Sequence, residues 1–184
     1  PTLVADRVAR HPWVKTATVA PEWMFGTLSI TVTERTPAAL AVDEEGRPAY
    51  YLSRAGHALP LSDSTGYDVP LVRGLATNGV LPPPGRVLGP PVLRTLLVAL
   101  PTTDAGSLVA EITVRPDRTV RLLTRPIGTH GAVPVRVGTE DVAQRLQTLH
   151  AFAQQVLAAQ PDASIEEIDL RFDGQVVTRK QPTG

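Results

Sequence analysis

Histidines and paired carboxylates are the side chains of this sequence best suited to catalysis or metal binding. The histidines are scattered, and no two have the spacing of a metal-ligand motif: His11, His57, His130 and His150. The carboxylate pair Glu44/Glu45 falls in a predicted turn, and Glu166/Glu167 precedes a predicted strand. General acid–base catalysis needs carboxyl groups that converge in a shared, partly buried site, and neither position favours one. We therefore expect no metal site, no cofactor and no catalytic residue.

Other chemical signatures are also missing from the sequence. The chain has no cysteine, which excludes disulfides, thiolate metal ligands and cysteine nucleophiles. No serine lies in a nucleophile elbow, and no glycine-rich phosphate loop follows a predicted strand. The formal net charge is zero, without the basic excess that is typical of nucleic-acid binding. A scaffold or binding module therefore fits the sequence better than an enzyme or a nucleic-acid-binding protein.

The closing segment offers chemistry of another kind, because the edge of a sheet binds through main-chain groups. Residues 164–181 read SIEEIDLRFDGQVVTRKQ, two strand-like runs around an Asp-Gly pair, which is a strong hairpin signal. In the first run Ile168, Leu170 and Phe172 share one face, which we expect to pack on the domain. The second run would be an edge strand with unpaired N–H and C=O groups.

Residues 175–180 are the part of this edge that we expect to bind a partner. Charge, proline and bulges usually blunt an exposed edge, but here the charged residues and Pro182 come only at its far end. A strand from another chain would add along the open part by main-chain hydrogen bonds. Arg171 would pair with an acidic residue of the partner, and Phe172 would offer apolar area. The predicted partner-binding residues are Arg171, Phe172, Gln175, Val176, Val177, Thr178 and Arg179.

The elements at the start of the chain are a helix and a hairpin. Residues 3–10 have helical spacing, and Pro12 ends that helix. Residues 14–20 and 27–35 alternate in hydropathy and are joined by a short turn, which predicts a pair of antiparallel strands. We expect one face of the second strand to be half-buried through three apolar residues: Leu28, Ile30 and Val32.

The rest of the chain mixes short strands with two helices. The predicted order is a strand at 48–52, an irregular crossing at 59–74, a Pro/Gly-rich connector at 78–91, a short helix at 92–100, a hairpin at 107–124 and a strand at 132–138. The strongest helix signal covers residues 139–160, with Thr139 as its N-cap and Pro161 as its end. Its apolar residues form one stripe: Val142, Leu146, Leu149, Ala153 and Val156. Strand runs broken by isolated helices favour an α+β fold with a largely antiparallel sheet.

Residues 11–41, HPWVKTATVAPEWMFGTLSITVTERTPAALA, resemble the end of the POTRA domain in the FtsQ/DivIB family of bacterial cell-division proteins. Three later stretches resemble further family features in the family's order: YYLSRAGHALPL at 50–61, PVRVG before the long helix and IDLRF after it. QVV resembles the tail in some branches of the family. The matching positions of the first segment are Pro12, Trp13, Val14, Trp23, Glu34, Arg35, Pro37 and Ala39.

The resemblance implies two domains. Residues 1–42 would be a POTRA domain, incomplete at its N-terminus and reduced to a helix and a hairpin. Residues 43–184 would be an FtsQ-type β domain, largely antiparallel, with a long helix in its C-terminal half. The resemblance implies that the family's first POTRA strand and helix, its single membrane helix and its cytoplasmic tail would precede residue 1. No run here approaches the roughly 18 apolar residues that span a bilayer, and the given sequence begins without an initiator Met. We therefore expect an excised segment.

The resemblance also implies a non-enzymatic protein of the division apparatus. It would be a single-pass inner-membrane protein with this segment on the periplasmic side, at the septum. Its partners would be FtsB-like and FtsL-like coiled-coil proteins, bound beside the last strand, and it would link early and late division proteins. Other division proteins would bind the POTRA part. Arg179 stands where some members carry an aromatic residue, so the contact of that aromatic would be altered here.

Three alternatives stay open from the sequence. A POTRA-bearing module of an outer-membrane assembly or secretion machine also binds by strand addition, but it predicts repeated POTRA units or a following barrel, and neither appears after residue 42. A periplasmic hydrolase would need a convergent polar pocket. Finally, the last strand would simply close the domain if the chain's own tail covered its edge.

Overall fold

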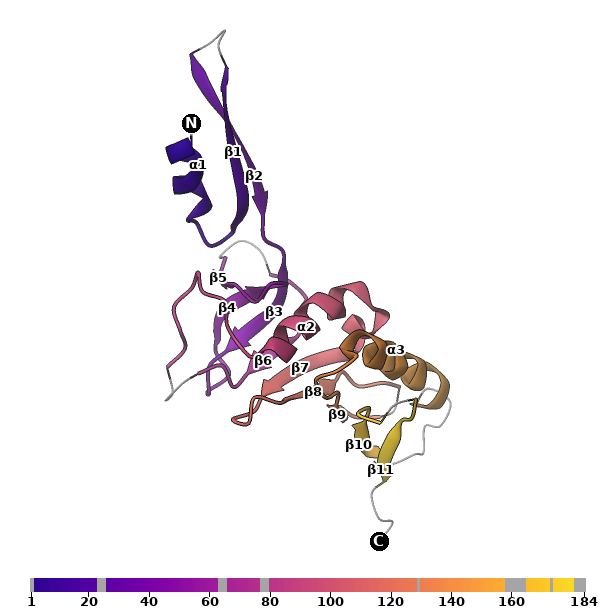
Figure 1. Ribbon diagram of the computed structural model, residues 1–184. Helices are drawn as coiled ribbons and strands as arrows, with labels where there is room; N and C mark the ends of the chain where they lie inside the picture. The colour runs from indigo at the N-terminus through magenta and orange to yellow at the C-terminus, as the bar shows by residue number, and fades with distance from the viewer. Residues whose placement is uncertain are drawn as a thin grey trace.

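The chain folds into two sheets of unequal size. The computed structural model describes residues 2–22, 26–62, 66–76, 80–128, 130–157, 165–172 and 174–180. Within these residues a helix and a two-stranded sheet project from a nine-stranded sheet that is covered by helices (Figure 1). Trp23, Pro161, the aspartate of the Asp-Gly pair and Pro182 lie outside the described residues. The arrangement confirms the α+β class.

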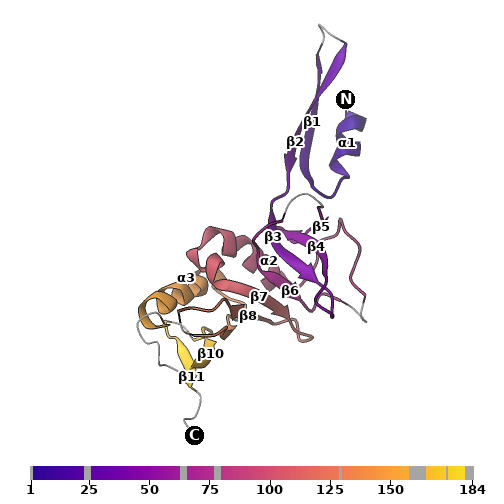
Figure 2. The same ribbon diagram turned by 180° about the vertical axis from the view of Figure 1, so that it is seen from behind.

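The projecting unit contains α1 (Thr2–Ala9), β1 (Val14–Glu22) and β2 (Thr27–Glu34). The two strands are antiparallel, with Val19 opposite Ile30, so the predicted helix and hairpin are confirmed. Figures 1 and 2 show the hairpin extending away from the large sheet, with α1 beside β1.

The predicted half-buried face of β2 is wrong. Leu28, Ile30 and Val32 are 50%, 45% and 41% exposed. The physical reason is that α1 packs against β1, where Val19 is partly buried, and the described elements make at most slight contact with the apolar face of β2. Alternating hydropathy identified the strand, but burial depends on a covering layer that the described residues do not supply.

The large sheet is mixed. From one edge to the other its strands run in the order β11-β10-β9-β8-β7-β6-β3-β4-β5. The pairs β3–β6, β6–β7 and β9–β10 are parallel, and the other five neighbouring pairs are antiparallel. The strand bounds are β3 (Pro37–Val42), β4 (Pro48–Ser53), β5 (Ala58–Pro60), β6 (Leu71–Arg73), β7 (Val109–Val114), β8 (Val120–Thr124), β9 (Pro134–Arg136), β10 (Ile165–Asp169) and β11 (Val177–Lys180).

Helices cover one face of this sheet, and the hydrophobic core lies between the helices and the sheet. They are α2 (Pro91–Ala99) and α3 (Val142–Phe152), the latter continued by a π-helical turn, η3 (Ala153–Leu157). Short 3-10 turns, η1 (Leu100–Thr102) and η2 (Asp104–Leu108), lead from α2 into β7. The two helices bury their leucines against apolar side chains of the sheet, and this removal of apolar surface from water holds the layers together. Core residues with at most 2% exposure include Leu93, Leu96, Leu97, Leu146, Leu149, Ile112, Leu122 and Ile168.

The start of α3 differs from the prediction. Asp141, not Thr139, occupies the N-cap position, and its side chain makes no capping hydrogen bond. Gly138 and Asp141 both have positive φ, 73° and 46°, so the chain turns between them instead of entering the helix. The predicted apolar stripe is buried at Val142, Leu146, Leu149 and Ala153, but the π-helical turn buries Leu157 in place of Val156.

None of the helices in the described ranges has both the length and the apolar character of a bilayer-spanning segment.

Candidate partner-binding site

Strand β11 forms one edge of the large sheet. It pairs with β10 in antiparallel register, which confirms the predicted hairpin. No other strand lies beside it among the residues that the structure describes. Figure 1 shows β11, in yellow, at the outermost position of the sheet. The outer side of this strand therefore offers main-chain donors and acceptors on every second residue.

The opposite edge of the sheet is covered by the chain's own backbone. The N–H of Ala58 donates to the carbonyl of Arg86 at 2.8 Å, and the N–H of Gly85 donates to the carbonyl of Ala58 at 2.8 Å. His57 also bridges to Val87. Segment 85–88 thus shields β5, and proteins commonly protect an edge in this way. The described residues give β11 no such cover, so the two edges differ in their availability.

The register of β11 sorts its side chains onto two faces. Residues directly opposite one another share a face, so Val177 projects with Asp169 and Arg179 projects with Glu167. Thr178 lies on the other face, opposite the fully buried Ile168. Val176, just before the strand, packs against the core on this inner side. The edge therefore has an outer face with charged neighbours and an inner face continuous with the apolar core.

Phe172 and Arg171 lie beside this edge, and Phe172 does not pack as predicted. Phe172 is 51% exposed and does not pack on the domain, because β10 ends at Asp169 and the chain leaves the alternating pattern after the buried Leu170. The Arg171 guanidinium donates two hydrogen bonds to the Asp169 carboxylate, from Nη2 to Oδ2 at 2.7 Å and from Nε to Oδ1 at 2.9 Å. The hydrogen bond from Arg171 lowers the pKa of Asp169 and raises that of Arg171. A partner carboxylate would have to compete with Asp169 for this arginine.

The sequence carried a signal for this ion pair that the prediction did not use. Residues i and i+2 of an extended segment point to the same side. Asp169 and Arg171 have this spacing and opposite charges, so they are placed to meet within the chain.

Phe172 and Gln175 border a hollow beside the start of α3. Its volume is about 380 Å³, and its lining residues are Asp141, Gln144, Arg145, Thr148, Leu170, Phe172, Gly174 and Gln175. Val176 and β11 continue from Gln175 along the edge. Arg171 lines another hollow, with Arg121 and Arg136. The seven predicted residues therefore lie along the edge and around its beginning, but on more than one face.

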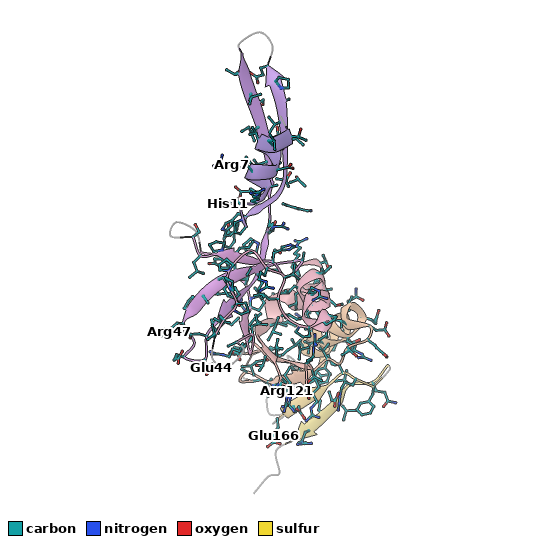
Figure 3. All side chains as sticks on the ribbon, turned by 60° about the vertical axis from the view of Figure 1, so that its left-hand side comes forward. Arg7, His11, Glu44, Arg47, Arg121 and Glu166 are labelled. Carbon is teal, nitrogen blue, oxygen red and sulfur yellow. The ribbon has the colours of Figure 1, made fainter. Side chains whose placement is uncertain are left out.

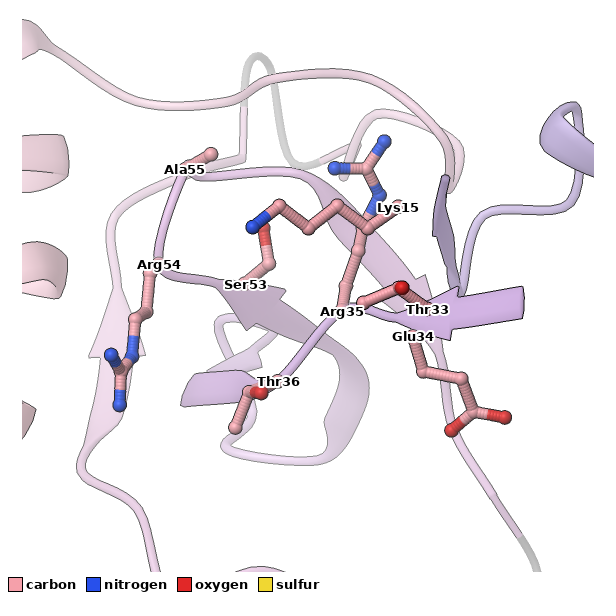
Figure 4. A pocket seen from close by; sticks show the side chains of 8 residues that line it. All are labelled: Lys15, Thr33, Glu34, Arg35, Thr36, Ser53, Arg54 and Ala55. Atoms are coloured by element: carbon pink, nitrogen blue, oxygen red, sulfur yellow. The ribbon is translucent and has the colours of Figure 1, made fainter. Parts of the chain in front are cut away.

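A second hollow lies at the junction of the two units, and the sequence did not point to it. Its volume is about 330 Å³, and Figure 4 shows its lining, with the Lys15 amine toward Ser53 and the Glu34 carboxylate turned away. The remaining lining residues are Thr33, Arg35, Thr36, Arg54 and Ala55.

Trp13 and Arg35 fasten the projecting unit to the large sheet at this junction. The N–H of Arg35 donates to the carbonyl of Trp13 at 2.7 Å, and its Nε donates to the carbonyl of Pro12 at 3.2 Å. The indole Nε1 of Trp13 donates to the carbonyl of Pro60 at 3.2 Å, and its ring packs against Tyr51 and Tyr67. These contacts give Trp13 and Arg35 a structural role at the junction.

Replacing Trp13 with alanine will loosen this junction. The change removes a partly buried ring, two aromatic contacts and one hydrogen bond, and we expect it to lower the free energy of unfolding by about 2 kcal/mol. Limited proteolysis should then cut between Glu34 and Pro37 faster than in the unaltered chain. Trp13→Phe keeps most of the ring packing and should lie in between. Equal cleavage rates for all three proteins would show that these contacts do not hold the two units together.

The histidines and paired carboxylates do not converge. Figure 3 places His11 on the projecting unit, Glu44 at one part of the large sheet and Glu166 at another. His130 Nε2 lies 3.0 Å from the carbonyl oxygen of Leu157, a contact that fastens a turn to η3. The pKa of His57 is lowered by burial and by Arg35. Across the described part of the chain, no group of three or more histidine or acidic side chains is arranged to hold a metal ion.

Comparisons with known proteins identify the family of the chain. The model of the family "FtsQ/DivIB, C-terminal related" matches residues 36–179. The cell division protein FtsQ of Salinibacter ruber is 61% identical over 99% of this chain and 70% of its own length. The FtsQ proteins of Rhodothermus marinus and Myxococcus fulvus are 42% and 28% identical, and the chain spans 66% and 59% of their lengths. The chain therefore belongs to the FtsQ/DivIB family of cell-division proteins.

Proposed function

We propose that this chain is a non-catalytic scaffold of the division apparatus that binds FtsB-like and FtsL-like coiled-coil proteins by strand addition at β11. Through these partners it links early and late septation proteins. The single observation that carries the proposal is that no described residue pairs with the outer side of β11, in contrast to the shielded β5 edge. Main-chain hydrogen bonds along an exposed edge supply affinity, and side-chain contacts on alternate residues supply specificity. The family assignment favours this role over that of an outer-membrane assembly or secretion module.

We further propose that the two sheets are two domains, an incomplete POTRA domain and a β domain. Strand β3 pairs with β4 and β6 in the large sheet, so the boundary that we propose lies between Glu34 and Pro37 rather than at residue 42. The exposed apolar face of β2 fits a POTRA layer that is completed by further chain. Other division proteins would bind this domain. The segment would lie on the periplasmic side of the inner membrane at the septum, anchored by a helix outside these residues.

A proline in β11 tests the proposed docking. Proline has no N–H, so it removes one main-chain donor wherever it is placed. Adjacent residues of an antiparallel strand point their N–H groups to opposite sides, so one of Val177→Pro and Thr178→Pro removes a donor that faces the partner. We expect that variant to weaken binding of an FtsB-like extracytoplasmic segment about tenfold or more, measured by calorimetry, because a lost donor leaves a buried partner acceptor unpaired.

Two controls keep this experiment interpretable. Val177→Thr is also β-branched and retains the N–H, so it should bind nearly normally. Circular dichroism and thermal unfolding of each proline variant will show whether the domain remains folded, as expected for a change in a short edge strand. If both proline variants are folded and bind at full strength, the partner does not dock on β11.

A further inference from the structure

The outer face of the sheet carries a row of ion pairs that leads to β11. Arg73 of β6 pairs with Glu111 of β7, with Nε and Oε2 at 2.9 Å. On the strands nearer the edge, Glu167 of β10 receives both Arg136 at 2.8 Å and Arg121 at 3.5 Å. These residues share a face because the strands are in register, with Arg121 opposite Arg136 and Arg136 opposite Asp169. Each carboxylate of the row is therefore already neutralised within the chain.

Arg179 ends this row, and no carboxylate among the described residues pairs with it. It lies opposite Glu167, but Glu167 is already bound by two arginines. The other carboxylate on this face of β10, that of Asp169, is held by Arg171. In the part of the chain that the structure describes, no ion pair reaches Arg179, and its side chain is exposed. The row thus presents an excess positive charge at the open edge of the sheet.

The inner face of the same edge favours apolar side chains in a docked strand. Val176 is partly buried against the core, and Thr178 is partly buried opposite Ile168. A strand added beside β11 would place alternate side chains next to these two residues and would extend the buried layer by one strand. Its remaining side chains would lie on the outer face, beside Val177 and Arg179.

We propose that the strand which adds to β11 alternates apolar and polar residues and carries an aspartate or glutamate on its outer face beside Arg179. The inference rests on the proposed function, since it assumes docking on this edge, and it specifies the partner by its charge pattern. Opposite charges on neighbouring strands attract, whereas like charges directly opposite one another repel. A second copy of this chain is disfavoured as the occupant, because it would bring another unneutralised Arg179 to the same outer face. The arginine thus selects an acidic strand and discourages self-pairing.

A charge reversal tests this inference. With the extracytoplasmic segment of the FtsB-like protein from the same organism, we expect Arg179→Glu to weaken binding about tenfold, because one cross-strand attraction is lost and a repulsion of similar size replaces it. The loss should shrink as salt is raised, since an exposed pair is screened. Arg54→Glu makes the same change of net charge at an exposed site far along the sheet, and it should bind normally.

Substitutions in the partner strand provide the decisive test. Each acidic residue in its strand is changed to lysine in turn, and one of these changes should restore binding to Arg179→Glu while weakening binding to the unaltered chain. If Arg179→Glu binds normally although a proline in β11 abolishes binding, the acidic contact is wrong and docking on β11 stands. If neither change affects binding, docking itself is wrong. Self-association of the unaltered chain through β11, seen by sedimentation and removed by the proline, would also overturn the inference.

Discussion

Replacing Leu96 with alanine is expected to lower the free energy of unfolding by about 3 kcal/mol. Leu96 is fully buried in α2, among the leucines that join this helix to the sheet. Truncation removes apolar contacts and leaves a cavity that the close-packed interior fills only in part. Urea unfolding, followed by circular dichroism, measures the loss as a lower midpoint at an unchanged slope.

The same helix provides the matched control for Leu96→Ala. Val98 is two residues further along, and it is 53% exposed. Val98→Ala should change the free energy of unfolding by no more than about 0.5 kcal/mol, as surface substitutions usually do. Similar losses for the two variants would show that α2 does not present the Leu96 face to the sheet.

The regular elements were predictable because their side chains repeat with the period of the backbone. The stripe Val142, Leu146 and Leu149 identified α3, and alternation identified the hairpins β1–β2 and β7–β8. The last hairpin was predictable from its Asp-Gly pair, and this gave the candidate edge. Local patterns suffice where the structure depends on neighbours in the sequence.

Features that depend on distant residues were not predictable. Strands β5 and β6 have three residues each; β5 ends with Pro60, and Pro70 precedes β6. They are too short to show alternation, and most of their residues fell in the segment predicted to be irregular. The junction joins Trp13 to Pro60, which are 47 residues apart. The exposure of Leu28 and the shielding of β5 by segment 85–88 likewise depend on which element covers which. No periodicity encodes such coverage.

The candidate site also combines features that depend on sequence neighbours with features that depend on distant residues. Its position at an edge followed from local signals, whereas its charge pattern followed only from the strand order. Arg121 and Glu167 are 46 positions apart in the sequence and meet because β8, β9 and β10 are neighbours. That Arg179 has no ion-pair partner among the described residues can be recognised only once the neighbouring pairs are known. The sequence therefore located the edge, and the register indicated which strand would complement it.

Gly74 occupies a position where a side chain would force two central strands apart. It follows β6 with φ at +77°, a left-handed conformation that costs a non-glycine residue about 1–2 kcal/mol. A Cβ there would also overlap the carbonyl oxygen of Val114, at the end of β7. Strands β6 and β7 pair in the middle of the sheet, with Arg73 opposite Thr113, so the overlap cannot be relieved by moving a flexible side chain.

Gly74→Ala is therefore expected to lower the free energy of unfolding by about 3 kcal/mol, the sum of backbone strain and overpacking. Gly128→Ala is the control, because Gly128 also has positive φ, +59°, but a Cβ there meets nothing within 4 Å. The control should lose only about 1 kcal/mol, through strain alone. Thermal unfolding of the two variants side by side measures the difference. Equal losses would mean that the close approach of Gly74 to β7 does not exist in solution, and that the centre of the sheet is joined differently.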